Sequence, residues 1–279
     1  MGFFLVMKAE LVQSWIITRR YWFRTVIGIL IGYGMLMVLI AGLLKGGDMP
    51  HSMPGMGDPV KATNFALGFI VGMFAFGIVG MYTQGLQGMA ASGILEQLCL
   101  SPHGLVTNFM ARTVVGSVWT IITSAILVWM VTKSVGGTLH YDPGAVLAIM
   151  ALTFANLVGF GFLVGGLVLV FKQVGQVAMI LRMVLFGLAV MVNEDTLYGD
   201  TNFVFKAVMH FLPVTDAAVA LKYVLIKGQM NAEGQFVSVF AHPSFYFMMV
   251  SCVLWGVIGI AFFRAMENYS RSKGTLGSF

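Results

Sequence analysis

Residues 145–171 read AVLAIMALTFANLVGFGFLVGGLVLVF and contain no charged side chain. A helix rises about 1.5 Å per residue, so this segment is long enough to cross the roughly 30 Å hydrocarbon core of a bilayer. Charged residues flank the run, with Asp142 before it and Lys172 after it. The segment therefore predicts a membrane-spanning helix.

Similar apolar segments recur along nearly the whole chain of 279 residues. The other five lie at about 21–44, 62–83, 111–132, 177–192 and 244–263, of which 177–192 is the shortest. Hydrophobic residues make up 58% of the chain and charged residues only 10%, against roughly 25% charged in soluble domains. No polar block is long enough to fold separately, so we predict one all-α integral membrane domain over 1–279 with six transmembrane helices.

Charge is distributed unequally between the two ends of these spans, which predicts the orientation of the chain. One side collects most of the basic residues and few acids: Lys8, Arg19, Arg20, Arg24, Arg112, Lys172, Arg182, Arg264, Arg271 and Lys273 against Glu10, Glu96 and Glu267. We expect this side to be cytoplasmic, with both termini inside and the protein in the cell (plasma) membrane. The net charge of +5 is scattered and forms no basic stripe, so no nucleic-acid partner is expected.

The segment before the first span, 3–20, has helical amphipathic spacing. Met7, Leu11 and Trp15 recur three to four residues apart among polar side chains. Such a helix is expected to lie at the membrane interface, in contact with lipid. Its role is either that of a simple anchor or that of a docking element.

The stretch before the last span is apolar in two short pieces, 203–212 and 217–226, which Pro213 separates. Thr215 or Asp216 can cap the second piece, and Gly228 follows where a helix would stop. Neither piece is long enough to span. We therefore predict two short outer or re-entrant helices within 203–227.

Sites for chemistry are scarce in the sequence. It has no GxxxxGK[ST] phosphate loop, no HExxH pair and no GxSxG elbow, so we expect neither an enzyme nor a cofactor bound by this chain. Cys99 and Cys252 give no disulfide framework. Thioether and imidazole groups that suit Cu(I) gather in one loop, but chance clustering among 21 methionines accounts for them, and no metal site is predicted. That loop carries Met49, His51, Met53 and Met56.

The connection after the second span reads GILEQLCLSP over 93–102. It resembles the G-T-L-E-Q-L-x-x-[ST]-P loop of permease subunits in the type 2 ABC exporter family, the drug, polyketide and polysaccharide exporters, with Ile94 in place of the usual Thr. The amphipathic helix, the six spans and the paired short helices also fit that family.

This resemblance implies a partner for the chain. Two permeases, identical or homologous, would pair in the membrane, and each would bind a cytoplasmic ATPase that carries the ATP and Mg. The loop 88–105 would couple to that ATPase through a short helix; its coupling residues would be Leu95, Glu96, Gln97, Leu98, Ser101 and Pro102. The plainer interpretation of Glu96 is a solvated acid, or one that the positive end of a helix dipole favours.

Three side chains mark a candidate substrate path: Arg182, Phe74 and Phe160. Arg182 falls near the middle of its span, where it would either face the path or snorkel to the interface, and we favour snorkelling. The aromatic spans suggest a hydrophobic or amphipathic substrate, such as a drug, a lipid-like compound or a glycan-linked one, although lipid-facing aromatics are equally expected.

Small residues four apart occur at Gly28 and Gly32, Gly68 and Gly72, and Gly161 and Gly165. They allow close helix packing, which we expect within one subunit rather than at a dimer seam.

Two other functions fit the hydropathy profile. One is a secondary carrier or channel that works without ATP, against which the absence of acids from the predicted spans counts. The other is a membrane assembly subunit that docks an ATPase but moves no solute. The exporter permease is the function that we expect from the sequence.

Overall fold

The computed structural model of the chain describes residues 2–44, 59–99, 104–136, 138–171, 175–199, 202–230 and 234–273. Within these ranges the fold is helical, and the only extended pairing is an isolated bridge between Met230 and Phe236. The predicted all-α fold class is confirmed.

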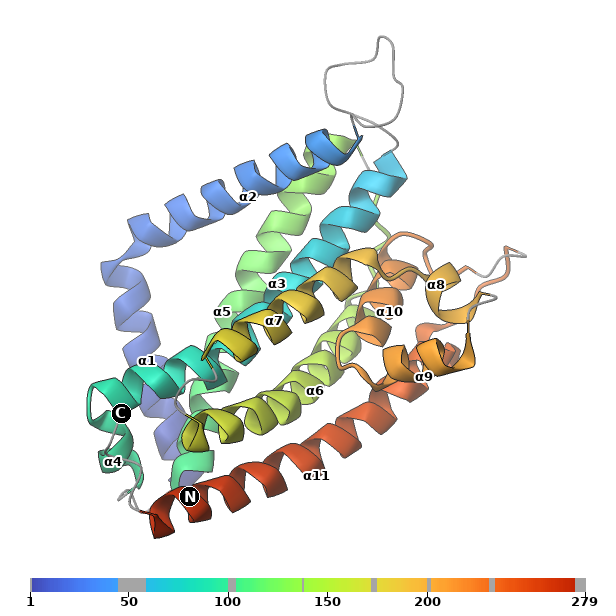
Figure 1. The fold of residues 1–279 in the computed structure, drawn as a ribbon. Coiled ribbons are helices and arrows are strands. Elements are labelled where there is room, and N and C mark those ends of the chain that lie inside the picture. Colours follow the sequence, from blue (N-terminus) through green and yellow to red (C-terminus); the bar gives the residue numbers. More distant parts are fainter. Residues whose placement is uncertain are drawn as a thin grey trace.

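Among the described residues, five helices are long and apolar enough to cross a membrane. They are α2 (Trp22–Leu44), α3 (Pro59–Ala91), α5 (Gly104–Val135), α6 (Pro143–Val170) and α11 (Pro243–Ser272). α3 packs along α5 and α6, and α6 packs along α11, through much of the length of the molecule (Figure 1). The chain is therefore a multi-pass helical membrane protein.

The remaining expected span, 177–192, corresponds to α7 (Gly175–Met191). At 17 residues α7 is about 25 Å long, somewhat less than the roughly 30 Å of the hydrocarbon core. It packs along α3, where Gly68 and Gly72 bring the backbones together: a Cβ on Gly68 would meet the Cα of Val190 at 2.8 Å. α7 is thus a short helix held tightly against a long one.

The two short helices predicted around Pro213 are present as α9 (Phe203–Phe211) and α10 (Thr215–Leu225). Their axes differ by 86°, and if the pair is taken as one broken span the molecule has up to six spans. The Thr215 hydroxyl donates hydrogen bonds to the carbonyls of Met209 and Leu212 across the break. Every residue of α10 is buried, so this helix is a core element of the fold.

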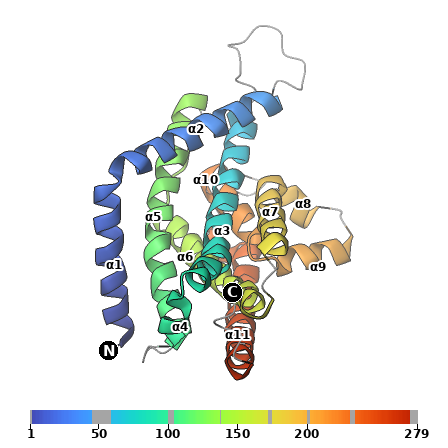
Figure 2. The same cartoon turned by 60° about the vertical axis from the view of Figure 1, so that its left-hand side comes forward.

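Both ends of the described chain lie at the same end of the molecule, which we call the termini end. α1 (Gly2–Arg20) begins there, runs along α5 and continues into α2 through a bend at Tyr21 (Figure 2). The short helix α4 (Ile94–Cys99) joins α3 to α5 at this end. Two further short elements, α8 (Glu194–Tyr198) and a 3-10 turn (Val239–Ala241), lie at the opposite end.

α6 and α11 approach each other more closely than any pattern in the sequence indicates. A Cβ on Gly159 would lie 2.5 Å from the carbonyl carbon of Trp255 and 2.7 Å from the amide nitrogen of Gly256. The carbonyl of Gly159 in turn occupies the space that a side chain on Gly259 would need. Glycines outside the pairs spaced four apart therefore fix the contact between α6 and α11.

The glycine pairs that were expected to pack within one subunit mostly do so. Gly68 and Gly72 contact α7, and Gly161 and Gly165 receive Tyr82 and Leu86 of α3. In contrast, a Cβ on Gly28 would meet nothing within 4 Å. Much of the apolar surface of α2 and α5 is exposed in the single chain, including Ile31, Val38 and Trp129. Such surface has to be covered by lipid or by another protein.

Candidate functional site

The motif-bearing connection folds into α4 at the termini end of the molecule. α3 ends with the Ser92 and Gly93 amides bonded to the carbonyls of Gly88 and Ala90. Gly93 has φ +72°, a left-handed conformation that residues other than glycine adopt at a cost. This turn lets the chain reverse into the single short helix before α5 begins at Gly104, which also has positive φ.

α4 is anchored to the rest of the chain mainly by Leu95, and Leu98 and Cys99 pack against the same core. Leu95 is fully buried in the main hydrophobic core, together with Leu105 of α5 and Met89 of α3. At the other end of the helix, the Arg271 guanidinium donates to the Cys99 carbonyl at 3.3 Å and pairs with Glu267 at 2.6 Å. α4 is therefore connected to α3, α5 and the end of α11.

The predicted coupling residues fall into three groups in the structure. Leu95 points into the core, Gln97 is exposed and Leu98 is half-buried; Ile94, which was not among the predicted residues, is also exposed. Glu96 belongs to α4, but its side chain is not among the described ones, and the remaining two predicted residues lie outside the described residues: Ser101 and Pro102. The surface that α4 offers to a partner thus includes Ile94 and Gln97, not Leu95.

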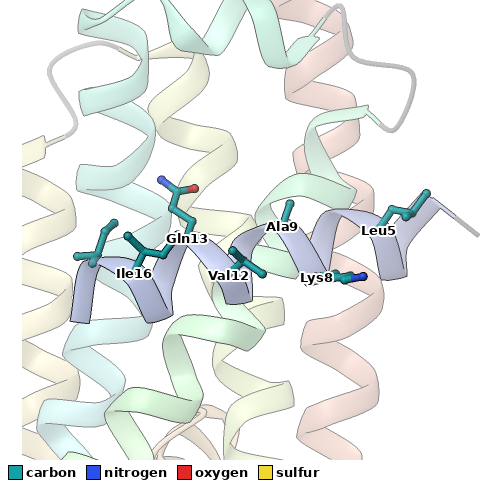
Figure 3. A pocket seen from close by; sticks show the side chains of 7 residues that line it. Leu5, Lys8, Ala9, Val12, Gln13 and Ile16 are labelled. Carbon is teal, nitrogen blue, oxygen red and sulfur yellow. The ribbon is translucent and has the colours of Figure 1, made fainter. Parts of the chain in front are cut away.

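The predicted interfacial helix is α1, and its faces differ from the expectation. Trp15 stacks on Trp119 of α5, with ring centroids 6.5 Å apart, yet remains 62% exposed, and Leu11 is also exposed. Met7 is half-buried. A shallow groove on α1 is formed by side chains of this helix alone, as Figure 3 shows: Leu5, Lys8, Ala9, Val12, Gln13, Ile16 and Ile17. α1 therefore has apolar surface on more than one side, and its place at a membrane interface stays a prediction.

Arg182 does not snorkel, so the favoured expectation is wrong. Its side chain is 4% exposed, its Nε donates to the Phe76 carbonyl at 3.0 Å, and its guanidinium carbon lies 3.7 Å from the centre of the Phe76 ring. Gly80 makes the necessary room, because a Cβ there would lie 2.5 Å from the guanidinium. The cation is held at the contact between α3 and α7 by a carbonyl and an aromatic face.

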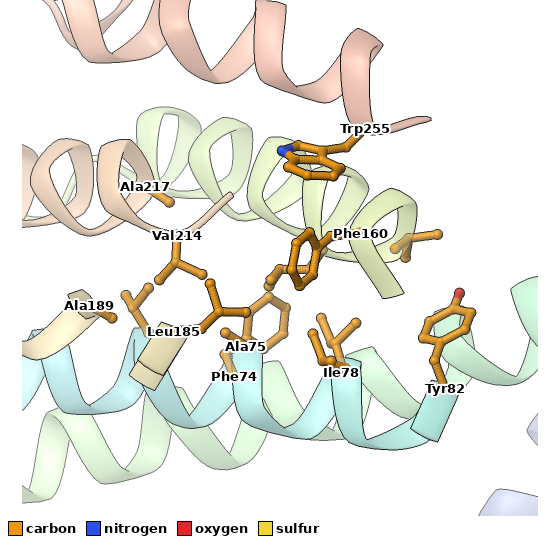
Figure 4. Close-up of a cluster of buried hydrophobic side chains, with 14 of the residues drawn as sticks. Phe74, Ala75, Ile78, Tyr82, Phe160, Leu185, Ala189, Val214, Ala217 and Trp255 are labelled. Atoms are coloured by element: carbon orange, nitrogen blue, oxygen red, sulfur yellow. The ribbon is translucent and has the colours of Figure 1, made fainter. Parts of the chain in front are cut away.

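The two aromatic residues of the candidate path belong to the packed core. Phe74 is 1% exposed and Phe160 is 5% exposed. Figure 4 shows Phe160 between Trp255 and the side chains of α3, and its ring meets that of Trp255 edge to face at 4.8 Å. Within one chain these residues support helix packing, so a path that used them would require the helices to separate.

Ionisable side chains gather at the opposite end of the molecule. Nδ1 of His210 lies 3.0 Å from both carboxylate oxygens of Asp216, which is 3% exposed, and the His210 ring stacks on Phe247 at 3.9 Å. Nearby, the Tyr198 and Ser244 hydroxyls lie 2.7 Å apart. The sequence predicted Asp216 only as a helix cap. Its pairing with His210 across the break at Pro213 was missed, although both were visible as ionisable residues in an apolar segment.

Metal ligation finds no support in the described part of the chain, where no group of three His, Cys, Asp or Glu side chains converges. The loop considered for Cu(I) lies outside the described residues: Met49, His51, Met53 and Met56.

Comparisons of the chain with protein-family models, with curated proteins and with solved structures gave no match.

Proposed function

We propose that this chain is the permease subunit of an ATP-driven exporter, and that α4 receives the movement of a separate cytoplasmic ATPase. The observation that carries the proposal is the position of α4 between two helices that exceed the bilayer thickness. α3 has 33 residues and α5 has 32, so each is about 48–50 Å long against a hydrocarbon core of roughly 30 Å. The excess length would hold α4 clear of the membrane, in the aqueous phase.

The contacts of α4 suit the transmission of force. Leu95 fixes it to α3 and α5, and Arg271 connects its end to α11. A displacement of α4 would therefore move three long helices together rather than bend a loop. The exposed Ile94 and Gln97 would meet the ATPase, as a short helix seated in a groove of its partner.

The orientation of the proposed permease follows from its charges. The termini end carries α4 and the basic residues Arg264 and Arg271, and it would be cytoplasmic. A second permease, identical or homologous, would cover part of the exposed apolar surface of α2 and α5. The substrate would be hydrophobic or amphipathic and would move along that interface, because the interior of the single chain is packed.

A second candidate function is proton-coupled transport without ATP, and one observation favours it. Asp216 is a buried acid paired with His210 inside the bent pair of helices. Carriers use such pairs to bind and release protons, because an ionisable group in the membrane is costly unless it has a partner or a function. This candidate requires transport that follows a pH gradient in the absence of any ATPase.

The experiment that tests the proposal is co-purification with a candidate ABC ATPase from the same organism. The wild type should retain that ATPase through purification, and Glu96→Lys should release it. Glu233→Lys is the matched control, since it reverses a charge that the sequence places on the other side of the membrane. Retention of the ATPase by Glu96→Lys, or equal loss in the control, would contradict docking at α4.

A further inference from the structure

A cavity of about 240 Å³ with charged side chains in its lining lies at the end of the molecule opposite the termini. It is lined by the start of α3, by Asn193 and the first residues of α8, and by α10 with the residues that follow it. Its polar lining consists of Asn64, Asn193, Glu194, Asp195, Lys222 and Lys227. None of these residues belongs to the proposed docking surface on α4.

The central cation of this cavity is Lys222, which is only 6% exposed. Its ammonium donates to the Val192 carbonyl at 2.7 Å, to the Asn193 side-chain oxygen at 3.2 Å and to the Val190 carbonyl at 3.4 Å. The two carbonyls lie at and just after the end of α7, where the last carbonyls of a helix have no partner within it. Lys222 therefore caps α7, but only neutral acceptors surround its charge.

Within the described residues, no carboxylate lies within 4.0 Å of the Lys222 ammonium. A buried ammonium without a counter-ion is costly, even when dipoles surround it. The contact to Val190 is also long for a charge-assisted hydrogen bond, which is usually about 2.7–2.9 Å. An anionic oxygen in the cavity could replace that weak contact and neutralise the charge.

The rim of the cavity carries two acidic residues, Glu194 and Asp195, and only one of them has a cationic partner among the described side chains. Glu194 pairs with Lys227 at 2.7 Å, which leaves this pair internally neutral. Asp195, the next residue, is exposed and forms no ion pair within the described part of the chain. One buried cation and one exposed anion thus remain without partners of opposite charge in the same cavity.

The size of the cavity limits what could bind. Its 240 Å³ is below the roughly 300–1,000 Å³ of sites for drug-sized ligands. The rest of its lining is apolar or aromatic and consists of Val60, Val219, Tyr223 and Ile226. A small group that carries both charges fits this description better than a large hydrophobic molecule. We propose that the cavity binds a zwitterionic phosphate of the phosphoethanolamine class, with its phosphate at Lys222 and its ammonium at Asp195. The group could belong to a lipid headgroup or to a free compound.

The binding experiment uses calorimetry on the full chain in a detergent without phosphate. Phosphoethanolamine, inorganic phosphate and ethanolamine are titrated separately. A hydrogen bond between charged groups corresponds to a change of roughly 10- to 150-fold in affinity. Phosphoethanolamine should therefore bind at least about tenfold more tightly than inorganic phosphate.

Variants separate the two ends of the site. Lys222→Met should weaken the binding of both phosphates at least about tenfold, and Lys222→Arg should largely restore it. Lys133→Met is the matched control, since Lys133 is an exposed lysine outside the cavity. If Lys222→Met fails to fold, Asp195→Asn still decides: it should weaken phosphoethanolamine but leave inorganic phosphate unchanged.

The source of the ligand is tested with lipids of equal chain length. Stabilisation of the wild type by phosphatidylethanolamine but not by phosphatidylglycerol would identify a lipid headgroup, whereas binding of free phosphoethanolamine alone would identify a soluble compound. Equal affinity for phosphoethanolamine and inorganic phosphate, no effect of Asp195→Asn, or no binding in either arm would overturn the proposal. No ATPase takes part, so these results are independent of the proposed coupling through α4.

Discussion

The close approach of α6 and α11 makes Gly159→Ala a sensitive test of the helix packing. The new Cβ would lie 2.5 Å from the Trp255 carbonyl carbon and 2.6 Å from its oxygen, whereas ordinary contacts are 3.4 Å or more. All the opposing atoms are backbone, so no side chain can rotate away and the helices must separate by about 1 Å. Overpacking of this kind costs about 1–3 kcal/mol.

The matched control is Gly256→Ala on the facing helix. A Cβ on Gly256 meets nothing within 4 Å, so this variant gains only the roughly 1 kcal/mol by which Ala exceeds Gly in helix propensity. Gly159→Ala has the same gain, which therefore cancels between the two variants. Unfolding by SDS in mixed micelles, followed by tryptophan fluorescence, should show Gly159→Ala less stable than Gly256→Ala by about 1–3 kcal/mol. Equal unfolding midpoints would refute the packing of these helices.

Two further predictions concern buried ionisable groups. Arg182→Met should leave stability unchanged or raise it slightly, because the buried guanidinium has only a carbonyl and a ring as partners. Gly80→Val displaces that guanidinium and should lower stability by about 1–3 kcal/mol in the same SDS titration. Burial lowers the pKa of His242 below its ordinary 6.5, and its Nδ1 accepts the Ser244 amide at the start of α11. The unfolded chain then binds more protons, so the stability that the neutral imidazole contributes is present above about pH 6.5 and is lost as pH falls through the lower folded pKa. Between pH 7.5 and 5, thermal unfolding should show a smaller loss of stability for His242→Asn than for the wild type, because Asn still caps the helix but does not titrate. Identical pH profiles of the two proteins would contradict this role of His242.

The sequence predicted what depends on local patterns. The apolar runs identified the long helices. Pro213 and Gly228 identified the boundaries of the two short helices, of which the second is the buried α10. The expected span at 177–192 corresponds to a helix of only 17 residues, because length alone does not separate a marginal span from a helix packed against a neighbour.

Contacts between distant residues could not be predicted. Gly159 and Trp255 are almost a hundred positions apart, and each is unremarkable in its own helix. The burial of Arg182 could not be predicted, because the space for its guanidinium is made by Gly80, which belongs to another helix. Nothing in the sequence singled out Lys222, and only the fold places its ammonium at the end of α7. Sites built from several helices are therefore the part that required the structure.

We propose that α4 couples this chain to an ATPase, and the direct test of this coupling is ATP hydrolysis in liposomes. The wild type and Glu96→Lys are each reconstituted with the candidate ATPase, and turnover is measured with and without hydrophobic candidate substrates. We expect the wild type to stimulate hydrolysis and Glu96→Lys to abolish the stimulation, while Glu233→Lys behaves as the wild type. An ATPase whose turnover is the same with the wild type, with Glu96→Lys and without any permease would contradict it.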